Sequence, residues 1–111
     1  TSEGQVQLRS IQSCAFDTTD RQRMLRIVIA TMQDLGFVID QADEILGSVS
    51  GTKLAGYAMR LSVTVRPRGK TQLLVRANVQ YKLTQVVDPE PYQQFFAALS
   101  RALFLEANLV E

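Results

Sequence analysis

The chain has 111 residues, of which 46% are hydrophobic and 21% are charged, and its formal net charge is +1. This composition is typical of one soluble globular domain and excludes an intrinsically disordered chain. There is no histidine and one cysteine, Cys14, which excludes an internal disulfide and histidine-based acid–base catalysis. No apolar run approaches the ~18 residues that a membrane-spanning helix requires. We interpret the polar residues 1–5 as a tether and residues 6–111 as a single domain.

The first part of the domain is predicted to form a strand and a helix. Apolar residues alternate imperfectly over residues 6–16, which favours a strand with a bulge near Ser10. Thr19 and Gln22 have the spacing of a capping box, which predicts that a helix begins there. An apolar stripe at helical spacing follows, and Gly36 is the expected C-terminal stop because glycine readily adopts the left-handed conformation.

The middle of the chain is predicted to consist of strands. Residues 37–40 form a short strand, residues 41–44 a polar turn, and residues 45–52 a strand whose glycines favour a bulge or a close backbone approach. The strongest pattern is a long hairpin over residues 59–87, with its turn at residues 67–70. Apolar side chains occupy its odd-numbered positions, as in strands with one buried and one exposed face.

A second helix is predicted to begin at Pro89. Asp88 can cap it, proline is tolerated at its first position, and Glu90 favours the positive end of the helix dipole. Its inward stripe consists of Tyr92, Phe95, Phe96, Leu99, Ala102 and Leu103. The order β-α-β-β-β-β-α predicts an α+β two-layer sandwich, with an antiparallel sheet of about four to five strands and both helices on its odd-numbered face.

The even-numbered face of the hairpin is the first candidate binding surface, since no acidic residue lies between Glu44 and Asp88. The candidate partner-binding cations are Arg60, Arg66, Arg68, Lys70, Arg76 and Lys82. They are consistent with a solvated face that discourages edge-to-edge aggregation, with a contact to protein or anionic lipid, or with nucleic-acid binding. The face offers no aromatic side chain on which bases would stack, which makes nucleic acid the least favoured partner.

The end of the last helix is the second candidate surface. Phe104, Leu105 and Leu109 lie partly off the inward stripe, so the helix is apolar over more of its circumference than one sheet covers. These side chains either complete the core near the first strand or contact another protein, including a second copy of the chain.

The sequence contains little that points to catalysis. There is no glycine-rich phosphate loop, and Asp40, Asp43 and Glu44 lack the regular spacing of a calcium loop. Cys14 is interpreted as a small buried residue of the first strand. We therefore expect a non-catalytic domain without metal or cofactor. The remaining hypothesis is an enzyme or carrier with a pocket between the helices and the sheet.

One segment resembles a known class of domain. The run from Met32 to Asp40, MQDLGFVID, followed after an acidic turn by the glycine-containing run from Ile45 to Val49, is similar to small domains of Gram-negative envelope lipoproteins. The helix-grip domains of BamC, a lipoprotein of the β-barrel assembly machinery, share this order of elements. The closing run from Tyr92 to Glu106 also resembles the last helix of such lipoproteins.

The resemblance implies a periplasmic domain, anchored to the outer membrane by a lipid on a trimmed N-terminal segment. It implies a non-catalytic, protein-binding or scaffold component of an outer-membrane assembly, transport or secretion system. Its partners would be other envelope proteins, and it assigns no functional residue. A cytoplasmic nucleic-acid-binding module that uses the basic hairpin face is the alternative.

Overall fold

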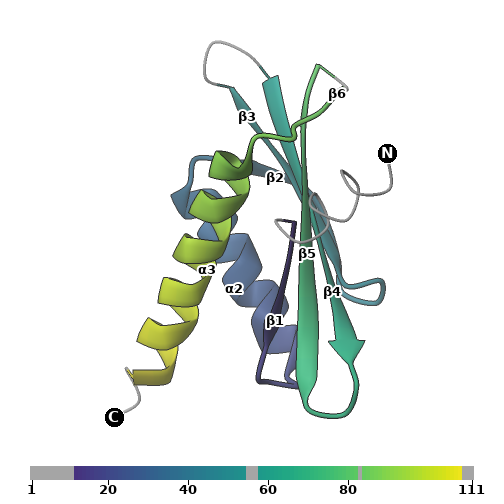
Figure 1. Cartoon of the computed structure of the whole chain (residues 1–111), viewed down its shortest axis with the longest axis vertical. Helices are drawn as coiled ribbons and strands as arrows, with labels where there is room; N and C mark the ends of the chain where they lie inside the picture. Colours follow the sequence, from purple (N-terminus) through teal and green to yellow (C-terminus); the bar gives the residue numbers. More distant parts are fainter. Residues whose placement is uncertain (1–11, 55–57, 83, 109–111) are drawn as a thin grey trace.

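The computed structural model describes residues 12–54, 58–82 and 84–108, and within these ranges it has two layers. The strands pair antiparallel in the order β1-β5-β4-β3-β2, and β6 pairs with β5. Figure 1 shows both helices on the same side of this sheet, which confirms the predicted α+β sandwich. The elements are β1 (Ser13–Phe16), α2 (Arg21–Asp34), β2 (Val38–Asp43), β3 (Ser48–Leu54), β4 (Ala58–Arg68), β5 (Gln72–Tyr81), β6 (Thr84–Gln85) and α3 (Pro89–Asn108).

The core lies between the helices and the odd-numbered face of the sheet, as the alternation predicts. Val63, Val65 and Val75 are fully buried on this face. From the helices, Val28, Met32 and the inward stripe of α3 pack against the sheet residues. Even-numbered residues of β4 and β5 lie on the opposite, outer face.

The predicted start of α2 is one residue early. The N-cap is Asp20, whose Oδ1 accepts from the Arg23 amide at 3.0 Å, whereas Thr18 Oγ1 accepts from the Asp20 amide. Aspartate and threonine are both favourable N-cap residues, so the sequence pattern does not decide between positions 19 and 20. The predicted stop at Gly36 is confirmed by its φ of +96°.

The strands after α2 differ from the prediction at their turn. β2 runs through Asp43, and the turn occupies residues 44–47, so Ile45 and Leu46 lie outside β3 instead of beginning it. Gly47, with φ of +71°, takes the left-handed conformation that closes this turn. A register shift between Ile39 and Gln41 bulges β2, where the sequence had suggested a bulge in the following strand.

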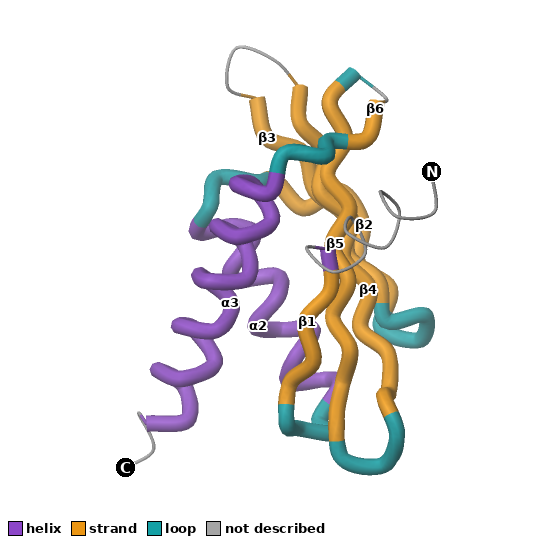
Figure 2. The backbone as a smooth tube through the Cα atoms, viewed as in Figure 1, coloured by secondary structure: helices purple, strands orange, loops and turns teal. Residues whose placement is uncertain are grey.

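The long hairpin differs from the prediction at its turn and at the end of its second arm. Its turn covers residues 69–71, with Gly69 at φ of +62°, while Pro67 and Arg68 remain in β4. The second arm ends at Tyr81, because Lys82 adopts a φ of +51° and the chain then returns as β6 beside β5. Figure 2 shows the β4–β5 turn projecting at one end of the molecule, away from the start of α3.

The hydroxyl of Tyr92 joins α3 to the edge of β5. It accepts hydrogen bonds from Gln12 Nε2 at 3.1 Å and from the Val79 amide at 3.2 Å, and it donates to the Val86 carbonyl at 2.6 Å. Tyr92 is completely buried. It therefore satisfies backbone groups in the interval between β1 and β6, where no strand among the described residues pairs with β5 on that side.

Several predicted features lie outside the described residues. These are the tether at residues 1–5, the start of the first strand with its bulge, and Leu109. Within the described ranges, neither helix has the length and apolarity that crossing a membrane demands.

Candidate functional site

The predicted basic face is present, but its cations fall into separate groups. Arg60 pairs with Gln80 at one end of the hairpin, whereas Thr64 pairs with Arg76 and Arg66 with Leu74 toward the turn. Arg66 is six positions from Arg60 along β4, or about 20 Å, whereas Arg76 lies opposite Thr64, so the shortest separation between the groups is four positions, or about 13 Å. This exceeds the screening length of about 8 Å at physiological ionic strength, so the two groups act independently.

The group at the turn consists of Arg66, Arg68, Lys70 and Arg76, all of them exposed. Within the described ranges, no carboxylate lies within ion-pair distance of any of these four side chains. At the other end, Lys82 leaves the strand alternation, and its Nζ lies 5.4 Å from the centroid of the Tyr81 ring. The stripe of cations that the sequence suggests is therefore a cluster at the turn, with Arg60 and Lys82 at the other end of the hairpin.

The second candidate surface is also exposed. Phe104 is 65% exposed and Leu105 is 49% exposed. The interpretation that these side chains complete the core near the first strand is therefore wrong. Nearby on α3, Glu106 pairs with Arg23 of α2 at 2.9 Å. The two helices are thus joined beside this surface.

The groups with possible reactivity are spread over the fold. Burial raises the pKa of the half-buried Cys14 thiol, which reduces its thiolate fraction at neutral pH. Asp40 accepts from Thr52 Oγ1 at 2.6 Å, and Asp43 accepts from the Leu46 amide at 2.9 Å. Among the described residues, no group of three potential ligands is placed to hold a metal ion.

The β2–β3 turn is the surface that sequence reasoning missed. Ile45 is 85% exposed and Leu46 is 63% exposed, and they are adjacent in the chain. The sequence pattern predicts a strand there because both residues are apolar and β-prone. The segment DEILG could have indicated the turn. Two acidic residues precede its two apolar residues and a glycine follows them, which is also compatible with a turn.

This turn is held in place by contacts to three other elements of the fold. Arg21 Nη2 donates to the carbonyl oxygens of Glu44 and Ile45 at 3.2 and 3.3 Å. The Val65 amide donates to the Gly47 carbonyl at 2.8 Å, and the Gly47 amide donates to the Asp43 carbonyl at 2.8 Å. With the Asp43 side chain on the Leu46 amide, the backbone that carries the two exposed aliphatic side chains is fixed.

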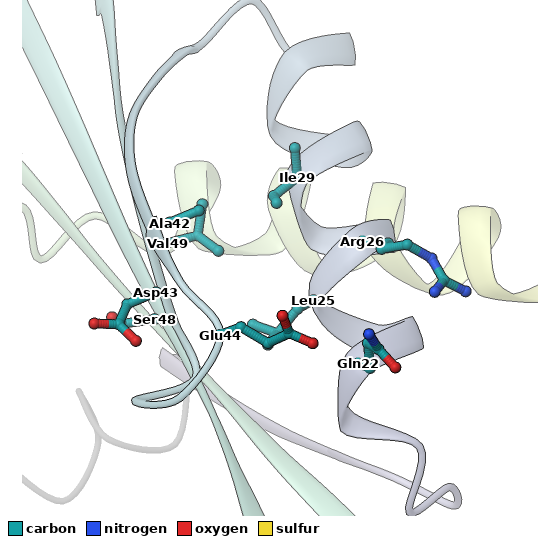
Figure 3. A pocket seen from close by; sticks show the side chains of 9 residues that line it. All are labelled: Gln22, Leu25, Arg26, Ile29, Ala42, Asp43, Glu44, Ser48 and Val49. Atoms are coloured by element: carbon teal, nitrogen blue, oxygen red, sulfur yellow. The ribbon is translucent and has the colours of Figure 1, made fainter.

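A groove of about 350 Å³ lies beside the turn, between α2 and the β2–β3 hairpin. Figure 3 shows Leu25 and Ile29 directed from α2 toward Ala42 and Val49, while the guanidinium of Arg26 points away from the strands. The wall is completed by the polar residues Gln22, Asp43, Glu44 and Ser48. The groove is thus an apolar depression with a polar margin, open at the surface. It lies between α2 and the β2–β3 part of the sheet, where the hypothesis of an enzyme or carrier expects a pocket. We call Ile45, Leu46 and this groove the turn surface.

Comparison with known proteins leaves the family open. No protein-family model matches the chain, and a search of curated proteins found no match.

Proposed function

We propose that this chain is a non-catalytic, protein-binding domain of a bacterial envelope lipoprotein, acting in the periplasm within an outer-membrane assembly, transport or secretion system. The compartment rests on the resemblance of the α2 exit, the following strands and the last helix to such lipoproteins. The binding role rests on one observation, which is that the fixed β2–β3 turn presents Ile45 and Leu46 to solvent.

The fixed backbone makes these side chains suitable anchors. Contiguous exposed apolar surface, such as two adjacent aliphatic side chains beside an apolar groove, commonly marks a contact with another protein. Association is weakened by the entropy lost when flexible groups become ordered, and a preformed turn reduces that loss. Since Arg21 and Asp43 already hold the turn by hydrogen bonds, a partner meets Ile45 and Leu46 in place.

The shape of the turn surface favours a protein over a small molecule. A small ligand is usually enclosed over most of its surface by a concave site. Ile45 and Leu46 project outward, so only a partner with its own depression covers them. The adjacent groove, with Leu25, Ile29 and Val49 in its apolar part, accepts an apolar side chain from the same partner.

Site-specific photo-crosslinking in the native host tests this proposal. A photoreactive amino acid is placed at position 45, 46 or 54 of the full-length gene product. Position 54 is the matched control because Leu54 is 81% exposed and lies at the far end of β3. We expect one discrete protein adduct from positions 45 and 46 that position 54 does not give. Equal adducts from all three positions would contradict the proposed surface.

The compartment is tested separately by fractionating the same cells. We expect the protein in the membrane fraction, and we expect added protease to digest it in spheroplasts but not in intact cells. Recovery in the cytosol, with resistance to protease in spheroplasts, would reject the envelope assignment while leaving the crosslinking result to decide the binding role.

A further inference from the structure

The outer face of the sheet has a small hollow on the half of the hairpin nearest the turn. It has a volume of about 110 Å³ and is lined by Thr64, Arg66, Leu74 and Arg76. Thr64 is opposite Arg76 and Arg66 is opposite Leu74, so the two arginines are diagonal neighbours on one face of an antiparallel pair. We call these four residues the hairpin hollow.

Among the described residues, no acidic side chain balances the charges around the hollow. Neither Arg66 nor Arg76 has a carboxylate within ion-pair distance in the described part of the chain. The nearby acid Asp17 accepts from Gln72 Nε2 at 2.7 Å. Like charges at close positions on a sheet face repel each other, so a bound anion would remove an unfavourable interaction.

The donors at the hollow match an oxyanion. Each guanidinium presents several N–H donors in a planar fork and no acceptor, which suits phosphate. The Thr64 hydroxyl adds a donor between the two arginines. The Arg76 Nε donates to Ser13 Oγ at 3.4 Å, a contact that restrains one guanidinium from the side of β1.

The size of the hollow limits what enters it. Sites for drug-sized ligands occupy about 300–1,000 Å³, so a hollow of about 110 Å³ takes a single compact group. We propose that Arg66, Arg76 and Thr64 form a binding site for one phosphate group, carried by a soluble phosphate ester or by a phospholipid headgroup. The site is independent of the turn surface.

Its location makes both sources accessible. The hairpin turn projects at one end of the molecule (Figure 1), and Arg68 and Lys70 next to it are exposed. The hollow opens on the exposed outer face close to this turn, so a phosphate group from either source can enter it. The two additional cations strengthen attraction to an anionic surface without entering the hollow.

The first experiment is a titration of the ¹⁵N-labelled protein with inorganic phosphate at low ionic strength, followed by NMR chemical shifts. We expect shifts at the backbone amides of residues 64, 66, 74 and 76 and at the Arg66 and Arg76 Nε–H groups. Arg66→Gln or Arg76→Gln is expected to weaken binding about tenfold, since charge-assisted hydrogen bonds are the stronger class.

Two further variants show whether the hollow itself is responsible. Arg60→Gln removes a cation from the same face, about 13 Å from Arg76 and about 20 Å from Arg66 along the strands, and is expected to leave phosphate binding unchanged. Arg66→Lys/Arg76→Lys keeps both charges but loses the planar forks, so intermediate affinity is expected. If phosphate does not bind, the proposed site is wrong. It is also wrong if Arg60→Gln lowers the affinity for phosphate as much as Arg66→Gln does.

The second experiment distinguishes the sources. Glycerol 3-phosphate is titrated in the same way, and cosedimentation is measured with phosphatidylglycerol-containing vesicles and with purely phosphatidylcholine vesicles. Binding of the soluble ester that depends on Arg66 and Arg76 identifies a soluble source. Binding to anionic vesicles only, with the same dependence, identifies a lipid source. Binding to neither, or binding that Arg66→Gln/Arg76→Gln does not reduce, overturns the proposal. Circular dichroism checks that each variant is folded.

Discussion

The two faces of the sheet are built from alternate residues of the same strands, yet they differ in almost every physical property. On the inner face, Val63, Val65 and Val75 are fully buried under the helices. On the outer face, Ser62, Thr64 and Arg76 occupy neighbouring positions and remain at least partly accessible. One face therefore supplies most of the hydrophobic stabilisation, and the other is free to vary with function.

The difference shows why stability and binding are separable in this fold. Substitutions on the outer face change charge and hydrogen bonding without opening a cavity in the core. The same backbone thus carries a fixed aliphatic interior and an adjustable polar surface. Substitutions on the two faces should therefore differ widely in their effect on stability.

The largest effect is expected from charge placed on the inner face. Val63→Asp buries a carboxylate where Val63 is completely inaccessible, and we expect a loss of several kcal/mol or more, sufficient to prevent folding. Ser62→Asp, one position away on the outer face, is the matched control and is expected to change stability by at most about 1 kcal/mol. Thermal unfolding followed by circular dichroism measures both. Similar losses for the two variants would show that the outer face is also part of a core.

The assignment of the two faces could be made from the sequence because it depends on a period of two sustained over many residues. A shift of one residue would invert every side chain of β4 and β5, so the pattern has only one acceptable register. The turn at residues 44–47 could not be predicted in the same way. Ile45 and Leu46 suit a strand locally, and their exposure depends on contacts from Arg21 and Val65, which are distant in sequence.

The next largest effect is expected at the edge of the inner face, where the Tyr92 hydroxyl makes its three hydrogen bonds. Tyr92→Phe retains the ring but leaves Gln12 Nε2, the Val79 amide and the Val86 carbonyl without this partner. We expect a loss of about 2–3 kcal/mol, because unsatisfied buried polar groups are costly. Urea denaturation gives the free energy of unfolding, and amide exchange should accelerate at Val79 more than at Val63. Equal exchange at both positions would show that the hydroxyl does not protect the edge.

A smaller effect is expected where the outer surface depends on a backbone conformation. Gly47→Ala places a Cβ 2.6 Å from the Val65 carbonyl oxygen, at a φ of +71° that side chains rarely adopt. We expect a loss of about 1–2 kcal/mol and a displaced turn. Gly69→Ala is the control, since its φ is +62° but nothing lies within 4 Å of an added Cβ. The crosslinking yield from position 46 should fall in Gly47→Ala and not in Gly69→Ala.

The smallest effect is expected from the ion pair that lies outside both faces. The side chains of Arg23 and Glu106 are 32% and 44% exposed, so water and salt weaken their attraction. A double-mutant cycle with Arg23→Gln and Glu106→Gln is expected to give a coupling of at most about 0.5 kcal/mol that disappears in 1 M salt. A coupling several times larger would contradict this prediction, because it would show that the surface ion pair contributes substantially to the free energy of unfolding.

The candidate sites show the same limit of sequence reasoning. The alternation of the sequence was enough to place Arg60, Arg66 and Arg76 on one face, because the face of a residue in a strand depends only on this alternation. Their division into two groups follows from the spacing of Arg60 from Arg66 and Arg76 along the strands. The departure of Lys82 from the strand could not be predicted, because its positive φ is not encoded in the alternation. The exposure of Phe104 and Leu105 was one of two interpretations, since helical spacing alone does not show how far the sheet extends beneath α3.

The hydrogen bonds of Tyr92 also constrain when the domain is completed during synthesis. Gln12 and Tyr92 are 80 residues apart in the chain, near the two ends of the described structure. Every strand of the sheet has left the ribosome before the side chain that closes the β5 edge is available. Until α3 emerges, the Val79 amide and the Val86 carbonyl lack this partner. A nascent chain that stops before residue 92 is therefore expected to expose an open strand edge, a state prone to mispairing with other chains.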